Sequence, residues 1–165
     1  MTNIISILCT VFLFTGCSTV DRNPVLGLKF LQPYPMMYGG GLHAGLDIDV
    51  PLNTPVRSIA DGTVTTAMTF DIRGMKTNII VINHENTVYS KYIHIDRLSV
   101  KHGDRVKQGD IIAKTALNGP GGLTGNIPVP YPHLHLEIFK NGERINPESL
   151  NMTCKNSTYI WPVGC

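Results

Sequence analysis

Four residues in two distant segments have the types and the spacing to bind a divalent metal ion together. His43 and Asp47 lie four apart in a glycine-rich stretch, and His133 and His135 lie two apart roughly ninety residues later. A catalytic zinc ion takes three ligands from His, Asp, Glu or Cys and keeps a fourth position open for water. Two histidines and one carboxylate meet this requirement. They leave one histidine to move protons, which metal-assisted hydrolysis also needs.

The spacing constrains the elements that must position these side chains. Histidine alternates with leucine in the run that starts at His133, so on a strand both histidines share one face and the leucines face a core. In a straight strand His43 and Asp47 would lie roughly 13 Å apart, near the limit of their joint reach. The chain must therefore bend between them, and Gly45 is the residue that bends at least cost. The alternative is four unrelated polar residues.

Five segments, in one order along the chain, carry a family resemblance. They are His43-Ala-Gly-Leu-Asp47-Ile-Asp-Val-Pro51, Thr54-Pro-Val-Arg-Ser-Ile-Ala-Asp-Gly-Thr-Val64, Tyr92-Ile-His94, Gly103-Asp-Arg-Val-Lys-Gln-Gly109 and His133-Leu-His135-Leu-Glu137. This order resembles the lysostaphin-like (LytM-type) zinc endopeptidases, which cut peptide bonds in bacterial cell-wall peptidoglycan. The resemblance spans about residues 40 to 148, most of the chain after its leader.

The resemblance implies a role for each of five residues. His43, Asp47 and His135 match the ligands of one zinc ion. His133 matches the catalytic base, and His94 matches a second catalytic histidine that would donate to the developing oxyanion. The implied activity is zinc-dependent hydrolysis of peptide crosslinks or stem peptides of peptidoglycan, with peptidoglycan as the partner.

Three other functions stay open. The first is a non-catalytic LytM-like envelope lipoprotein that binds and activates a cell-wall amidase, although such proteins typically lose ligands and all five candidates are present here. The second is a biotin- or lipoyl-carrier-like module, suggested by the segment Val100–Asp110, but Met75-Lys76-Thr77 differs from the Met-Lys-Met turn that carriers modify. The third is a zinc storage or structural site, which would leave His133 and His94 unexplained.

The N-terminal residues 1–16 are predicted to be a signal peptide of the lipoprotein type. Ile4–Phe14 is an apolar run with the length of a signal-peptide core, too short to span a bilayer. Phe14-Thr-Gly-Cys17 resembles a lipobox, in which Cys17 is diacylated and becomes the new N-terminus; two acyl chains anchor a protein stably. The alternative is an ordinary cleaved signal. We expect an exported envelope protein, periplasmic and lipid-anchored to a membrane.

Composition fits one small exported domain. About 149 residues follow the leader, enough for a single core. A formal net charge of +2 gives no argument for nucleic acid as a partner. We expect an anchor and irregular arm over 17–40, the endopeptidase domain over 41–150 and a C-terminal tail over 151–165.

Two cysteines of the C-terminal tail are predicted to form a disulfide. Cys9 lies in the leader, so Cys154 and Cys165 form an even remainder after Cys17 is set aside. An oxidising compartment favours their pairing. A metal-binding role for the pair would lack Cys-x-x-Cys spacing.

Short β-rich runs separated by turn signals predict an all-β chain. The runs are Val56–Ile59, Gly62–Met68, Asn78–Ile82, Val88–His94, Ile111–Lys114 and His133–Phe139. Asn141-Gly142 suits a tight hairpin turn, and no stretch shows sustained helical periodicity. We expect a compact antiparallel β-sandwich or half-open barrel. The family resemblance implies the same fold, with the site in a groove across one sheet.

Three further polar residues have weaker signals. On the strand that ends at His94, Tyr92 and His94 are expected to share one face, with Ile93 on the other. Asp49, two residues beyond Asp47, is either a hydrogen-bond partner for a ligand histidine or a plain surface acid. His84, at a strand end before a turn, is expected to be structural.

Overall fold

The computed structural model describes residues 30–32, 36–38, 41–72, 75–116 and 132–165. The predicted leader, Cys17 and most of the loop before His133 lie outside these residues. In the described part the elements are β1 (Phe30–Gln32), β2 (Met36–Tyr38), β3 (Gly41–His43), β4 (Leu46–Asp49), β5 (Pro55–Arg57), β6 (Gly62–Ile72), β7 (Met75–His84), β8 (Val88–Asp96), β9 (Arg105–Val106), β10 (Ile111–Thr115), β11 (His133–Lys140), β12 (Glu143–Ile145) and the 3-10 turn η1 (Pro147–Leu150). None of the helices among these residues has the length and apolar character needed to span a bilayer.

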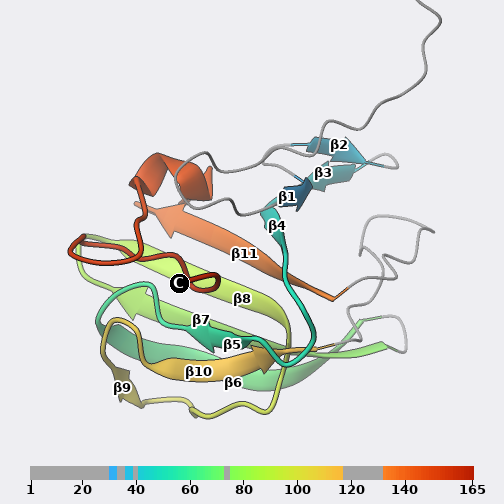
Figure 1. Ribbon diagram of the computed structural model, residues 1–165, viewed down its shortest axis with the longest axis horizontal. Coiled ribbons are helices and arrows are strands. Elements are labelled where there is room, and N and C mark those ends of the chain that lie inside the picture. The colour runs from blue at the N-terminus through green and yellow to red at the C-terminus, as the bar shows by residue number, and fades with distance from the viewer. Residues whose placement is uncertain (1–29, 33–35, 39–40, 73–74, 117–131) are drawn as a thin grey trace, which may run out of the picture.

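One large sheet positions the described strands (Figure 1). Its hydrogen-bonded order is β1-β4-β11-β8-β7-β6-β9, with β12 added to β11. β10 pairs with both β8 and β5, so the β5–β10 pair crosses over the sheet and closes the core from a second side. β2 and β3 form a separate two-stranded sheet. All pairings between these named strands are antiparallel, and this confirms the predicted all-β antiparallel fold.

Strand β11 separates an apolar face from a polar one. Leu134, Leu136 and Ile138 are fully buried in the core, whereas the histidines point to the other face. Full burial of each such side chain stabilises the fold by roughly 1.5–3 kcal/mol. The predicted alternation along this strand is therefore confirmed.

The β11–β12 hairpin turns at Asn141 and Gly142. Their φ angles of 54° and 82° are both left-handed, and Lys140 pairs with Glu143 across the two-residue loop. Positive φ at both central residues defines the type I′ turn, whose twist matches that of the flanking strands. The Asn-Gly signal in the sequence therefore predicted this turn.

The predicted strands differ from the observed ones mainly in extent. β6 and β7 pair along their whole length, from Gly62 opposite His84 to Ile72 opposite Met75, so both run past the predicted limits. The structure departs from the predicted anchor and irregular arm over 17–40 at two short strands, β1 and β2. β1 pairs with β4, and β2 pairs with β3. Pairing with an existing strand edge supplies hydrogen bonds that a local proline- and glycine-rich pattern does not reveal.

The C-terminal segment, residues 151–165, packs into the same core as the sheet. Trp161 is 1% exposed and belongs to the core cluster. Backbone hydrogen bonds tie the segment to the chain before β6: Arg57 N–H donates to Pro162 O at 2.9 Å, and Ile160 N–H donates to Ile59 O at 2.9 Å. The segment predicted as a tail is therefore an integral part of the domain.

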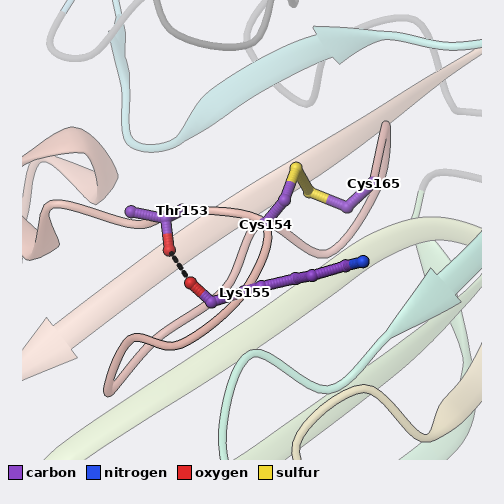
Figure 2. Close-up of a disulfide and its surroundings, with 4 residues drawn as sticks. All are labelled: Thr153, Cys154, Lys155 and Cys165. Atoms are coloured by element: carbon purple, nitrogen blue, oxygen red, sulfur yellow. Dashed lines mark hydrogen bonds between the residues drawn. A yellow bond between two sulfur atoms is a disulfide. The ribbon is translucent and has the colours of Figure 1, made fainter.

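A disulfide closes this segment on itself (Figure 2). Cys154 and Cys165 are joined, with Cα atoms 5.3 Å apart. Beside the bridge, the Thr153 hydroxyl donates to the carbonyl oxygen of Lys155 at 2.9 Å. Trp161 lies within the loop that the disulfide closes, between Cys154 and Cys165 in the sequence.

Candidate metal centre

Three side chains from three strands converge at one point. Asp47 on β4 lies opposite His135 on β11 in the strand register, and His43 ends β3 just before the bend into β4. His43 Nε2 lies 3.1 Å from His135 Nδ1 and 3.2 Å from Asp47 Oδ1, and His135 Nδ1 lies 2.6 Å from the same Asp47 oxygen. One nitrogen or oxygen from each residue therefore faces a shared centre.

The donor set of this centre fits a divalent metal ion. Ligand atoms held at roughly 2.0–2.1 Å around a tetrahedral zinc lie about 3.3 Å from one another. The two distances from His43 are close to that value, and the distance between His135 and Asp47 is shorter. Two imidazoles and a carboxylate also match the ligand types of catalytic zinc sites. These three residues are able to hold one such ion.

Gly45 makes room for His135. A Cβ atom at this position would lie 2.5 Å from His135 Nε2 and 2.8 Å from the backbone oxygen of Leu136. The chain does break between β3 and β4 here, as predicted. The physical reason differs from the predicted one, because Gly45 is not in the left-handed region, and the glycine is required by the close approach of β11.

Two further histidines lie beside the trio of His43, Asp47 and His135. His133 is 4% exposed, and its Nε2 lies 3.8 Å from Asp47 Oδ2. The ring of His94 lies 4.6 Å from that of His133 and 5.9 Å from that of His135, measured between centroids. His94 Nδ1 is buried and has no hydrogen-bond partner within the described ranges. The structure thus brings all five predicted site residues together.

A β-bulge directs His94 into the site, and the predicted shared face with Tyr92 was wrong. Ile79 and its neighbour Asn78 on β7 pair with Ile93 and Ile95, so His94 is an extra residue on β8 without a partner on β7. Its φ of 64° is left-handed, which is uncommon for a residue other than glycine. The bulge shifts the alternation, so that Tyr92 and Ile95 both face the core and His94 faces the other histidines.

The side chains of His43, Asp47 and His135 shift one another's pKa values through their close polar contacts. Burial alone would raise the pKa of Asp47, but hydrogen bonds from His135 and His43 outweigh it and hold that pKa well below its usual range. Burial alone would lower the pKa of His135, but its contacts with Asp47 and Glu137 raise it to about 9. Metal ligands must be deprotonated, so cation binding at this centre would release the proton from His135.

His94 is held in its neutral form. Burial, followed by the neighbouring charges of His133 and His135, lowers the pKa of His94 to about 3. A neutral imidazole keeps one N–H donor and one acceptor nitrogen. His94 can therefore offer a hydrogen bond at neutral pH without carrying a charge.

The sequence argument missed Glu137, although it lies on the same strand face. It is 4% exposed, and its Oε1 lies 3.5 Å from His135 Nε2 and 3.1 Å from Lys91 Nζ. Arg144 donates to Oε2 at 3.0 Å through Nε. Burial would raise the pKa of Glu137, but the contact with His135 and the charges of Lys91 and Arg144 lower it to about 2. The two-residue alternation from His133 was the signal that pointed here.

The remaining candidates lie in different surroundings. Asp49 is half-buried and is the register partner of His133 on β4. His84 is buried away from the trio; its Nδ1 lies 2.9 Å from the carbonyl oxygen of Asp61, and its Nε2 lies 2.7 Å from Ser90 Oγ. Both ring nitrogens of His84 are thus engaged within the fold, which agrees with the predicted structural role.

Comparison with protein families places this site in a known context. Residues 41–147 match the model of Peptidase family M23, a range that contains all five site residues. The peptidoglycan DD-endopeptidase ShyC of Vibrio cholerae serotype O1 is 38% identical over 110 residues, which cover 67% of this chain and 23% of that protein. The glycyl-glycine endopeptidase ALE-1 of Staphylococcus capitis is 36% identical over 109 residues, covering 66% and 28%. The chain spans about a quarter of the length of these curated relatives.

Solved structures show the same fold. The catalytic domain of the antimicrobial peptidase lysostaphin from Staphylococcus simulans superposes with a TM-score of 0.55 at 30% identity, over 71% of this chain and 84% of that domain. A zinc-containing peptidase from Vibrio cholerae superposes with a TM-score of 0.51 at 29% identity, over 77% of this chain and 32% of that one.

Proposed function

Since the chain belongs to peptidase family M23, we propose that it is a zinc-dependent metalloendopeptidase that hydrolyses peptide crosslinks or stem peptides of bacterial peptidoglycan. The observation that carries the proposal is the convergence of His43, Asp47 and His135 on one centre, with two more histidines beside it. Relatives named as peptidoglycan DD-endopeptidase and glycyl-glycine endopeptidase support a wall peptide as the substrate.

The trio would hold one zinc ion through His43 Nε2, Asp47 Oδ1 and His135 Nδ1. When bound at such a site, zinc lowers the pKa of a water molecule and polarises the scissile carbonyl. Three protein ligands leave a coordination position open for this chemistry. The donor set thus supports a catalytic rather than a closed structural site.

His133 is the general base of the proposed reaction. Its ring lies beside the trio, with Nε2 3.8 Å from the Asp47 oxygen that does not contact His135. From there it takes the proton of the nucleophilic water and passes it to the leaving amine. Proton transfer by a positioned side chain typically contributes about 10²–10⁴-fold to the rate.

His94 donates to the negative charge that develops on the carbonyl oxygen. A neutral ring with a fixed orientation suits this role, because pre-positioned donors stabilise such charge without reorganising. The bulge on β8 sets the orientation of the ring, and the contacts with His133 and His135 leave Nδ1 without a partner in the described structure. Nδ1 of His94 thus has hydrogen-bonding capacity that no described residue uses.

The test is digestion of defined peptidoglycan fragments by the purified zinc-loaded protein, with the products identified by mass spectrometry. His133→Ala should keep stoichiometric zinc and lose hydrolysis by about 10²–10⁴-fold, since the ligand His135 remains while the base is gone. His102→Ala, at an exposed histidine in the turn before β9, is the matched control and should cleave normally.

Each other outcome rejects a specific part of the proposal. If the His133→Ala variant also lost its metal, His133 rather than His135 would be the zinc ligand on β11. Full activity of this variant would remove His133 from the mechanism. A wild-type protein that binds zinc and cleaves no fragment would reject the hydrolase and favour the non-catalytic amidase activator.

For location, we propose an exported envelope protein anchored by lipid on Cys17. The apolar run before this cysteine and its lipobox-like sequence support the proposal. Cys17→Ser should move the protein from the membrane fraction to the soluble fraction. Cys9→Ser, in the part that the signal peptidase would remove, is the control and should stay with the membrane. A soluble wild-type protein with an unmodified N-terminus would contradict the anchor.

A further inference from the structure

Glu137 is a buried carboxylate that makes polar contacts with His135, Lys91 and Arg144. It follows His135 by two residues on β11, so both side chains lie on the same face of the strand. Its two oxygens are divided: Oε1 faces His135 Nε2 at 3.5 Å and Lys91 Nζ at 3.1 Å, and Oε2 accepts from Arg144. The carboxylate thus lies between the metal centre and two cations.

Stability alone does not account for this arrangement. Burying a carboxylate costs several kcal/mol, and its attraction to partners in the interior repays this cost only when the geometry is excellent. The cations themselves are partly in water, with side chains 28% exposed for Lys91 and 37% exposed for Arg144. Partly exposed ion pairs contribute little to folding. The position of Glu137 is better explained by what lies on its other side.

On that side lies His135, the proposed metal ligand, and its two ring nitrogens would have different roles. Nδ1 of His135 faces Asp47 and His43, so a metal ion there requires the lone pair on Nδ1 and the proton on Nε2. A histidine ligand usually donates its second ring N–H to a carboxylate or a carbonyl, and this contact fixes the tautomer and the ring orientation. Glu137 Oε1, 3.5 Å from Nε2 and so at the outer limit of hydrogen-bond distance, is in position to accept this N–H.

We propose that Glu137 is a positioning residue, which accepts the Nε2–H of His135 and so holds its Nδ1 toward the metal. Lys91 and Arg144 keep the carboxylate in place from β8 and β12. The inference rests on the proposed function, in which His135 is a zinc ligand. The inference gives Glu137, Lys91 and Arg144 a function at the metal centre, whereas the proposed function above uses none of them.

The experiment compares Glu137→Gln with Glu143→Gln, the same substitution at an exposed position on the adjacent strand β12. Zinc affinity is measured by competition with a chelator, and ligand geometry by the visible absorption of the cobalt-substituted protein. Glu137→Gln should weaken zinc binding by about 10–100-fold and shift the cobalt bands, because the partner of the ligand histidine has changed. Glu143→Gln should match wild type in both measurements.

A purely structural role predicts a different result. Glu137→Gln would then lower the melting temperature of the metal-free protein but leave zinc affinity and the cobalt spectrum as in wild type, and this outcome overturns the proposal. If Glu137→Gln does not fold, Lys91→Met and Arg144→Met each remove one support and keep the carboxylate. Each should weaken zinc binding several-fold; wild-type zinc affinity in both variants overturns the proposal.

Failure of this inference is separable from failure of the proposed function. A wild-type protein without stoichiometric zinc rejects the ligand assignment itself. A wild-type protein that binds zinc, with Glu137→Gln indistinguishable from Glu143→Gln, rejects only the role of Glu137.

Discussion

The metal centre and the C-terminal segment are attached to one core, but they bury opposite kinds of groups. At the centre, the buried side chains are ionisable: His43, Asp47, His94 and His133 are all 9% exposed or less. In the segment 151–165, the buried side chains are apolar, and backbone hydrogen bonds and a disulfide hold them. The centre therefore has a donor set that could hold a cation, whereas the segment is held by apolar packing, backbone hydrogen bonds and its disulfide.

The difference separates what each region contributes. The ionisable groups of the centre are paired with one another, and a cation bound by them would stabilise the folded state further. Apolar burial and a closed loop stabilise the fold whether or not a metal ion is bound. Substitutions at the centre should therefore change metal affinity first, and substitutions in the segment should change folding stability first.

Asp47→Ala should give the largest effect on the metal side of this comparison. Removing one of three ligands leaves too few donors, so stoichiometric zinc should be lost and hydrolysis with it. The metal-free protein should also be less stable than wild type, by up to about 3–5 kcal/mol, because the substitution removes one partner of the buried Asp47–His135 pair and leaves His135 unpaired. Metal analysis and urea unfolding test this, with Asp110→Ala at an exposed turn as control. Stoichiometric zinc in the Asp47 variant would refute the ligand assignment.

Gly45→Ala should lower both zinc affinity and folding stability. The added methyl group would lie 2.5 Å from His135 Nε2, so the ring must move away from the other donors. We expect zinc affinity to fall by more than tenfold, with a cost in stability of about 1–3 kcal/mol from overpacking. Chelator competition and urea unfolding measure the two effects. A variant with the zinc affinity of wild type would show that the close approach is not needed for ligation.

Loss of the disulfide should affect stability alone. Replacing Cys154 and Cys165 by serine should lower the free energy of unfolding by about 3 kcal/mol in the chain-entropy model and leave zinc affinity unchanged. Urea unfolding and chelator competition check both parts. Zinc loss in the folded serine variant would show that the C-terminal segment affects metal binding, contrary to the comparison.

His84 should give the smallest effect, through pH. Burial lowers the pKa of His84 in the folded protein below its ordinary value of 6.5, so the unfolded chain binds more protons as the pH falls. Its contribution to stability is present above pH 6.5 and is lost as the pH falls through the folded pKa. His84→Gln should reduce the loss of stability between pH 7 and pH 5, measured by urea unfolding. An unchanged pH dependence would remove His84 as its source.

Features that depend on local pattern were predictable from the sequence. The alternation from His133 to Ile138 gave the strand and its two faces, and Asn141-Gly142 gave the hairpin turn. The sequence also predicted that His43, Asp47 and His135 converge, and the structure brings their donor atoms together.

Features that depend on a distant partner were not predictable in the same way. The space required at Gly45 arises from β11, far along the chain. The bulge at His94 arises from the register between β7 and β8, and no property of the β8 sequence alone reveals it. Glu137 was within reach of the alternation argument, but its cationic neighbours come from two other strands.

The extra residue in β8 has a consequence for how such a site can be acquired. Tyr92 and Ile95 keep their core positions on either side of the bulge, so the insertion leaves the packing of the interior intact. Under regular alternation from Tyr92, the side chain of His94 would face the core, and the extra residue is what directs it to the other face. A reactive side chain can thus enter an existing sheet through a change in chain length, and the surrounding core sequence need not be rewritten.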